Sequence, residues 1–164
     1  MSEITLNDTV VKLQERDIVL NRTLNAPQDL VWEVWTQPEH LANWWGPQGF
    51  TITTLNFNFE PGGIWKFTMT GPDGVEYPNQ IVFREIQKPE RILYTSSDGD
   101  ENSQGQFQTT VTFTKDGDKT LVQMQMLFNT AEERDYVVKE YGAIEGGKQT
   151  LDRLSQLLES LRLQ

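Results

Sequence analysis

From Thr51 to about Asn129 the chain alternates apolar and polar residues, with turn signals between the runs. A period of two is typical of strands that bury one face, and short turns between consecutive runs favour an antiparallel meander. Pro72-Asp73-Gly74 and Asp116-Gly117 are such turns. The polar stretch from Ser96 to Gly105 is expected to be a mobile hairpin loop. Such a sheet needs a second layer to cover its apolar face.

Two short helices are predicted between a first strand, Arg16 to Leu24, and this sheet. The first helix carries an apolar stripe made of Leu30, Val31, Val34 and Trp35. The second runs from about Pro38 to Trp45. It stops at Gly46-Pro47, because glycine accepts left-handed backbone angles and proline cannot continue the helical hydrogen bonds.

A long amphipathic helix is predicted to begin after Thr130, which can cap it because Glu133 follows three residues later. Its apolar face consists of Val137, Tyr141, Ile144, Gly147, Leu151, Leu154, Leu158 and Leu161. That face must lie on an apolar surface, most simply the concave side of the sheet. Three glycines, Gly142, Gly146 and Gly147, each cost up to about 1 kcal/mol in a helix interior. They indicate a kink, a close backbone approach, or space left open above the sheet.

These elements predict an α+β fold in which a curved antiparallel sheet wraps around the long C-terminal helix, with two short helices after the first strand. Nothing in the 164 residues resembles a linker. We therefore expect a single domain over residues 1–164, with a core of about residues 16–162.

The charge balance narrows the range of partners. Acidic residues outnumber basic ones 24 to 14, which gives a formal net charge of -10. Such a field repels nucleic-acid phosphates and anionic lipid surfaces, and no basic patch overrides it. No apolar run is long enough to span a bilayer, and the N-terminus lacks the features of a secretory signal. We expect a cytoplasmic protein that neither binds nucleic acid nor inserts into a membrane.

The sequence offers little for metal or acid-base chemistry. There is no cysteine, and His40 is the only histidine. The run Asp98 to Asn102 begins like a calcium loop but is not followed by the glycine and glutamate that such a loop needs. Glu76 or Glu145 would serve as an acid only if buried beside a tyrosine. We therefore predict no metal, no cofactor and no catalytic residue.

Large aromatic and thioether side chains are expected to point into the space between the sheet and the last helix. Trp44 and Trp45 cannot both face inward, because successive helical residues are about 100° apart. One of them is expected at the mouth of an apolar cavity of about a few hundred Å³, unless both simply pack around the turn. The hydroxyls of Tyr77, Tyr94 and Tyr141 could orient a polar ligand atom, unless these tyrosines lie at the surface or bond within the protein. The predicted ligand contacts are Trp44, Trp45, Trp65, Phe67, Met69, Tyr77, Phe83, Met126, Tyr141 and Gly147.

Five stretches, in this order, carry a family resemblance: Ala26–Trp32, Trp44–Pro47, Pro61–Trp65, Gly71–Gly74 and Gly142–Leu154. They resemble the START-like (SRPBCC) superfamily of helix-grip domains. Within it, they are similar to the bacterial single-domain branch related to the C-terminal domain of the activator of heat-shock protein 90 ATPase. The resemblance covers about residues 16–162. It implies the helix-grip fold and an interior that binds hydrophobic molecules, lipids among them, or a surface that binds a partner protein.

Three functional hypotheses follow. The first is a domain that binds a small hydrophobic or aromatic molecule. The second is a co-chaperone-like, stress-response module that docks on a chaperone or other protein through its outer sheet face and acidic surface. The third, a cyclase- or hydrolase-like enzyme, is disfavoured because His40 lies outside the predicted pocket. The sequence is compatible with a monomer or a homodimer.

Overall fold

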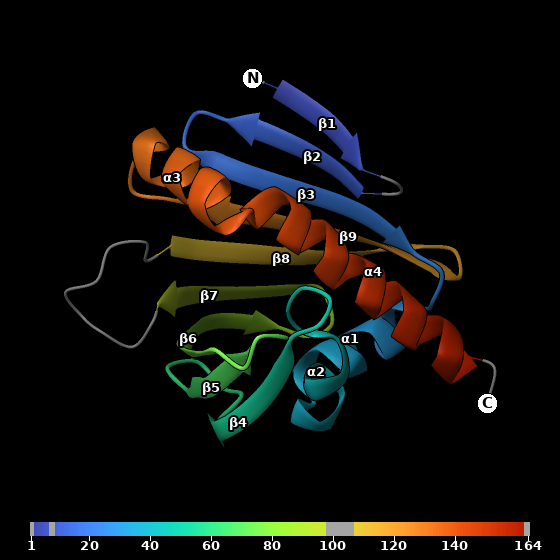
Figure 1. Ribbon diagram of the computed structural model, residues 1–164. Helices are drawn as coiled ribbons and strands as arrows, with labels where there is room; N and C mark the ends of the chain where they lie inside the picture. Colours follow the sequence, from blue (N-terminus) through green and yellow to red (C-terminus); the bar gives the residue numbers. More distant parts are fainter. Residues whose placement is uncertain (1, 7–8, 98–106, 163–164) are drawn as a thin grey trace.

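The computed structural model describes residues 2–6, 9–97 and 107–162 (Figure 1). Its strands are β1 (Ser2–Leu6), β2 (Thr9–Gln14), β3 (Asp17–Leu24), β4 (Thr51–Phe57), β5 (Ile64–Thr70), β6 (Glu76–Gln87), β7 (Arg91–Ser97), β8 (Phe107–Asp116) and β9 (Lys119–Leu127). Its helices are α1 (Gln28–Thr36), α2 (Pro38–Trp44), α3 (Ala131–Tyr141) and α4 (Ala143–Arg162). Most of the expected Ser96–Gly105 loop lies outside the described residues.

Within the described residues, nine strands form one antiparallel sheet in the order β1-β2-β3-β9-β8-β7-β6-β5-β4. Strands β4 to β9 make the predicted meander, and β3 then pairs with β9, placing Leu20 opposite Met124. The register shifts between Thr54 and Asn56, and again between Phe83 and Glu85. Such bulges bend a strand and increase its twist, which helps the sheet to curve toward one face.

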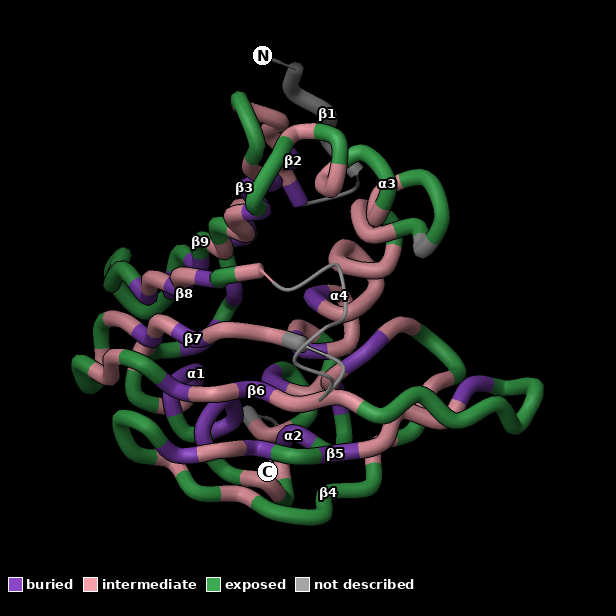
Figure 2. The backbone as a smooth tube through the Cα atoms, turned by 90° about the vertical axis from the view of Figure 1, so that its left-hand side faces the viewer, coloured by how far each residue is buried: buried purple, intermediate pink, exposed green. Residues whose placement is uncertain are grey.

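The helices lie on the concave side of the sheet. Figure 1 shows α4 crossing this side, with α1 and α2 near its C-terminal end, and Figure 2 shows α3 and α4 on the same side. Helix α4 contacts β2 and β3 as well as the other three helices. The predicted α+β helix-grip fold is therefore confirmed. No helix among the described residues is long and apolar enough to cross a bilayer.

Helix α4 sits directly on the sheet. Leu151, Leu154 and Leu158, spaced three and four residues apart, are fully buried beneath it. At Gly147 the backbone comes so close that an added Cβ would lie 2.6 Å from Leu20 Cδ1. Of the three explanations for the helical glycines, close approach therefore applies to Gly147. The expectation of open space above the sheet at that glycine is wrong.

A buried polar network fixes the same helix to the same strand. Arg22 on β3 donates a hydrogen bond from Nη1 to Asp152 Oδ1 on α4 at 2.6 Å and another to Thr9 Oγ1 at 3.2 Å. Lys148 lies 3.2 Å from the other Asp152 oxygen. The Arg22 side chain is only 7% exposed and that of Asp152 16%. A charged group so far from water needs such partners, so the network specifies where α4 lies.

Three local predictions need correction. Strands β1 and β2 precede the strand that was predicted first, and β2 adds the buried Val11 to the core. The single long helix is two helices, because Gly142 adopts a left-handed conformation (φ 59°) and ends α3. The predicted alternation from Thr51 onward would put Leu55 on the same side as Phe57, but the bulge at this position leaves Leu55 63% exposed. The Thr130 cap is confirmed, since its hydroxyl accepts from the Glu133 amide at 3.0 Å.

Adjacent glycines in α4 allow a matched test of this close approach. Alanine adds helix propensity worth up to about 1 kcal/mol at either position, and overpacking costs about 1–3 kcal/mol. At Gly146 the nearest atom is Pro47 Cγ at an ordinary 3.5 Å. We expect Gly146→Ala to raise the free energy of unfolding and Gly147→Ala to lower it by about 1 kcal/mol, measured by urea denaturation. Equal effects would contradict the close packing.

The Asp152 network predicts an acid-sensitive fold. Burial alone would raise the pKa of Asp152, but hydrogen bonds from Arg22 and Lys148 outweigh burial and lower it. A lowered folded-state pKa stabilises the protein above the unfolded value of about 3.9, and this stabilisation is lost as pH falls through the folded value. We expect Asp152→Asn to cost roughly 1.5–3 kcal/mol at pH 7 and to flatten the pH dependence of unfolding below about pH 4.

The matched control is Asp135→Asn, which removes a carboxylate that is 66% exposed and paired with Arg134. It should change stability by less than about 0.5 kcal/mol. If both variants lose the same stability at neutral pH, the proposed role of the Asp152 network is wrong.

Candidate functional site

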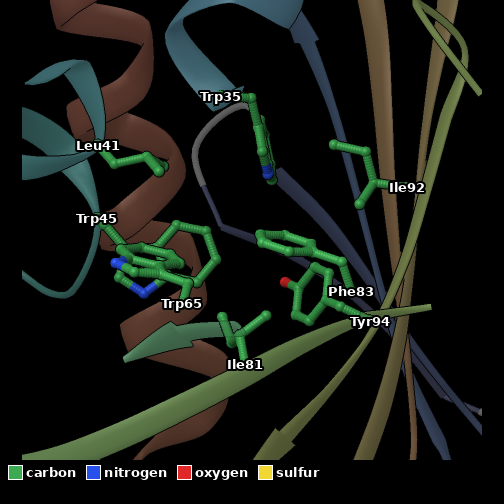
Figure 3. A pocket seen from close by; sticks show the side chains of 8 residues that line it. All are labelled: Trp35, Leu41, Trp45, Trp65, Ile81, Phe83, Ile92 and Tyr94. Carbon is green, nitrogen blue, oxygen red and sulfur yellow. The ribbon is translucent and has the colours of Figure 1, made fainter. Parts of the chain in front are cut away.

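Eight side chains surround a small space between α1, α2 and the inner strands (Figure 3). We call this group the aromatic box; it consists of Trp35, Leu41, Trp45, Trp65, Ile81, Phe83, Ile92 and Tyr94. Seven of the eight are buried, and Trp45 alone is half-buried. Trp45 is therefore the wall of the box that meets solvent.

Sheet register brings together the strand residues of the box. Trp65 on β5 lies opposite Ile81 on β6, and Phe83 on β6 lies opposite Tyr94 on β7. Cross-strand partners point to the same face, so these side chains project together toward the helices. Trp35 and Leu41 approach from α1 and α2. The box is thus assembled from segments far apart in the sequence.

Trp45 occupies a central place among the rings. It is the residue that follows α2, and its ring lies 5.1 Å from Trp65, 5.4 Å from Trp44 and 6.3 Å from Trp35, centroid to centroid. Phe67 and Tyr94 are each 6.5 Å away. The contacts to the other tryptophans and to Phe67 are edge-to-face, an arrangement that aromatic pairs favour.

The unfilled volume of the box is only about 10 Å³. This is about the space that one water molecule needs. The expected cavity of a few hundred Å³ is therefore wrong for this conformation, because the large aromatic side chains fill the interior themselves. A ligand larger than water would require a side chain to move.

Two hydroxyls supply the polar chemistry near the box. Tyr94 is buried, and burial raises the pKa of its hydroxyl, with the neighbouring Thr109 hydroxyl opposing this shift. Thr109 lies opposite Tyr94 on β8 and is 1% exposed, yet its Oγ1 has no hydrogen-bond partner of good geometry among the described residues. Tyr94 therefore remains protonated at neutral pH. It lies where a neutral polar atom could be recognised.

Of the ten predicted ligand contacts, Trp45, Trp65 and Phe83 line the box. Trp44 is fully buried and donates from Nε1 to the Val34 carbonyl at 3.0 Å. One tryptophan of the pair therefore packs while the other lines the space. Phe67 is buried and stacks on Trp65 with centroids 4.1 Å apart.

The other predicted contacts lie outside the lining of the box. Met69 and Met126 are half-buried on β5 and β9, and Gly147 packs against Leu20. Tyr77 is 43% exposed, with its ring 6.2 Å from that of Phe50. The side chain of Tyr141 is outside the described part of the structure.

Sequence reasoning missed four lining residues of the box: Trp35, Leu41, Ile81 and Ile92. The helical stripe placed Trp35 in the core, but nothing in that pattern indicated which buried residues border unfilled space. The candidate acids Glu76 and Glu145 are exposed, and His40 is half-buried on α2. Among the described residues, no group of acidic residues and histidine could hold a metal ion.

A second hollow, of about 230 Å³, is an open groove at the ends of β7, β8 and β9. None of the predicted ligand contacts borders it. Its lining is Arg16, Thr95, Phe107, Gln108, Leu127, Phe128 and Asn129.

The packing of Trp45 predicts a graded response to truncation. Trp45→Ala removes a half-buried ring and should lower the free energy of unfolding by roughly 2–4 kcal/mol, somewhat less than a fully buried tryptophan would cost. Trp45→Phe keeps a ring beside Trp65 and should lose less than half as much. Guanidinium denaturation of the three proteins measures the order. An alanine variant as stable as the parent would contradict the central packing of Trp45.

Comparison with known proteins agrees with this architecture. A protein from Arthrobacter aurescens is 24% identical, with a TM-score of 0.85 over 92% of this chain and 91% of its own. A protein from Nitrosomonas europaea is 26% identical, with a TM-score of 0.82 over 93% of this chain and 100% of its own. An AHSA1 protein from Silicibacter pomeroyi is 16% identical, with a TM-score of 0.70 over 87% and 97%. These likenesses establish the fold.

No curated protein matches the sequence. The profile of one family, described as activator of Hsp90 ATPase homolog 1-like protein, matches residues 25–159. This match includes both short helices, the aromatic box and most of α4. The chain therefore belongs to the activator of Hsp90 ATPase homolog 1-like family.

Proposed function

We propose that this domain binds a small, uncharged, flat aromatic or apolar molecule, which enters the aromatic box when the Trp45 ring moves aside. One observation carries the proposal: seven of the eight lining residues are buried, and only Trp45 is half-buried beside solvent. Displacing Trp45 joins the interior to the outside. The other walls need not leave the core.

The chemistry of the lining selects the ligand class. The box has no charged side chain, so an ionised ligand would lose its hydration without gaining a partner. Four of the eight residues offer an aromatic ring besides Trp45, which favours a flat molecule. The Tyr94 hydroxyl can bond one neutral polar atom, such as a ligand hydroxyl or carbonyl oxygen.

Closure of the box sets the energetics of binding. The ligand must select a conformation with Trp45 displaced, so its apparent affinity is reduced by the fraction of molecules in that state. Burial of the ligand at about 25 cal/mol per Å² of apolar surface offsets this cost. A flat ligand can also take over the ring contacts that Trp45 gives up.

A matched pair of probes tests the ligand class. We expect 2-naphthol to raise the melting temperature, because a molecule that binds only the folded state stabilises it, and 2-naphthoate to leave it unchanged. Tyr94→Phe should weaken binding of 2-naphthol roughly fivefold to tenfold and leave naphthalene unaffected. Native mass spectrometry of the freshly purified protein identifies any molecule that it already carries. Failure of every neutral aromatic probe to bind would overturn the proposal.

We propose protein docking as a second candidate function, favoured by the filled interior and by exposed apolar side chains near one end of the sheet. Leu55, Val75 and Tyr77 are 63%, 45% and 43% exposed on or beside β4 and β6. The net charge of -10 suits a basic partner, and such a complex should weaken with salt. Stimulated ATP hydrolysis by a chaperone of the heat-shock protein 90 class would support docking. We also propose a cytoplasmic location, with which the lack of cysteine agrees.

A further inference from the structure

One arginine on α4 binds the backbone of the segment that carries Trp45. Arg153 Nη1 lies 2.9 Å from the Gly46 carbonyl oxygen and 3.1 Å from that of Pro47. It also lies 3.4 Å from the carbonyl oxygens of Trp45 and Phe50, and Nη2 lies 3.4 Å from that of Asn43. Because Nη1 has two hydrogens, the two short contacts are the principal bonds and the longer ones share them.

The segment needs these bonds. Residues 45–50 follow α2 and precede β4, so neither a helix nor the sheet satisfies their carbonyl groups. Within the segment, the Phe50 amide donates to the Pro47 carbonyl at 3.2 Å. Apart from Arg153, α4 reaches this segment with a hydrogen bond from the Gln48 amide to Gln149 Oε1 at 3.1 Å. The segment is thus held on α4 chiefly by one guanidinium group.

Arg153 makes no ion pair within the described residues and bonds only to backbone carbonyls of this region. The neighbouring carboxylate, Asp152, instead forms ion pairs with Arg22 and Lys148. A charged donor bonded to several carbonyls gives stronger hydrogen bonds than a neutral one.

The backbone at Trp45 links this clamp to the aromatic box. Trp45 has extended angles (φ -68°, ψ 131°), and its own amide donates to the Leu41 carbonyl at 3.0 Å. The next residue, Gly46, has φ 98°, a left-handed conformation that favours glycine. The carbonyl groups of Trp45, Gly46 and Pro47 are among those that Arg153 contacts. A swing of the Trp45 ring together with its backbone would therefore break the clamp.

We propose that Arg153 is a positioning residue that holds Trp45 over the aromatic box and thereby sets the access of ligands to it. This inference rests on the proposed function, in which Trp45 is the movable wall. With the clamp formed, the segment after α2 stays on α4 and the box stays closed. With the clamp lost, Trp45 spends more time displaced, and ligands enter faster.

Arg16 supplies a matched control. Its Nη1 also donates to two backbone carbonyls, Phe128 at 3.2 Å and Asn129 at 3.3 Å. Arg16 belongs to the turn between β2 and β3, and Figure 1 shows this turn far from α2. Arg16→Gln therefore removes the same kind of interaction and the same charge without touching the Trp45 segment. Arg153→Lys keeps the charge of Arg153 but loses the planar fork that reaches several carbonyls.

Fluorine NMR of protein labelled with 5-fluorotryptophan reads the position of Trp45 without any ligand. The chain has 5 tryptophans, and the signal lost in Trp45→Phe assigns the resonance. In Arg153→Gln we expect the Trp45 resonance to shift or broaden well beyond the other four. In Arg16→Gln it should stay in place, and in Arg153→Lys the effect should be intermediate. A Trp45 resonance with the parent position and width in Arg153→Gln would overturn the proposal.

Stopped-flow binding of the neutral probe N-phenyl-1-naphthylamine gives the second readout. Its association rate should rise about tenfold in Arg153→Gln, the factor that corresponds to about 1.4 kcal/mol, and should stay unchanged in Arg16→Gln. A mobile Trp45 in a protein that binds no apolar probe would support the positioning role and refute the proposed binding function. If Arg153→Gln does not fold, Arg153→Lys is compared with Arg16→Lys, and an unchanged Trp45 resonance again overturns the proposal.

Discussion

The seating of α4 on the concave face of the sheet is the constraint on which the rest of this structure depends. Gly147 removes the side chain that would hold helix and strand apart, and the leucines that follow bury the apolar face of the helix. Asp152 then fixes the position through Arg22 on β3. Apolar packing supplies most of the stabilisation, but it is non-directional. The charged hydrogen bonds select one placement among several that would bury similar area.

With α4 in this position, Arg153 can donate hydrogen bonds to the backbone carbonyls of the segment that follows α2. The same helix therefore closes the core and holds the segment bearing Trp45. Domains that bind apolar molecules need an interior that is dry but accessible. Here aromatic rings fill the box and keep it dry, and in the proposed function ligands enter only at its one half-buried wall. Belonging to the family does not by itself fix the ligand, since function depends on the site and not the fold.

Periodicity predicted the meander, the two short helices and a helical C-terminal segment because each depends on local patterns of apolar residues. It did not predict that this segment is two helices separated at Gly142. It failed at Leu55, where a β-bulge reverses the alternation. No residue type in this stretch indicated the bulge. It also failed for Tyr77, which shares the alternation of β6 with Phe83 but lies on the exposed part of the strand. Alternation predicts which face of the sheet a side chain points to, but not whether that part of the strand is covered by other elements.

The sequence by itself determined that the two adjacent tryptophans could not both face inward from one helix, because successive helical residues are about 100° apart. It also determined the class of the fold and the Thr130 cap of α3. Only the tertiary structure decided that Trp44 is the packed one, that the interior holds about 10 Å³ of free space, and that Arg153 reaches the turn after α2. These outcomes depend on the summed volumes of side chains and on contacts between residues about a hundred positions apart, which no local pattern encodes.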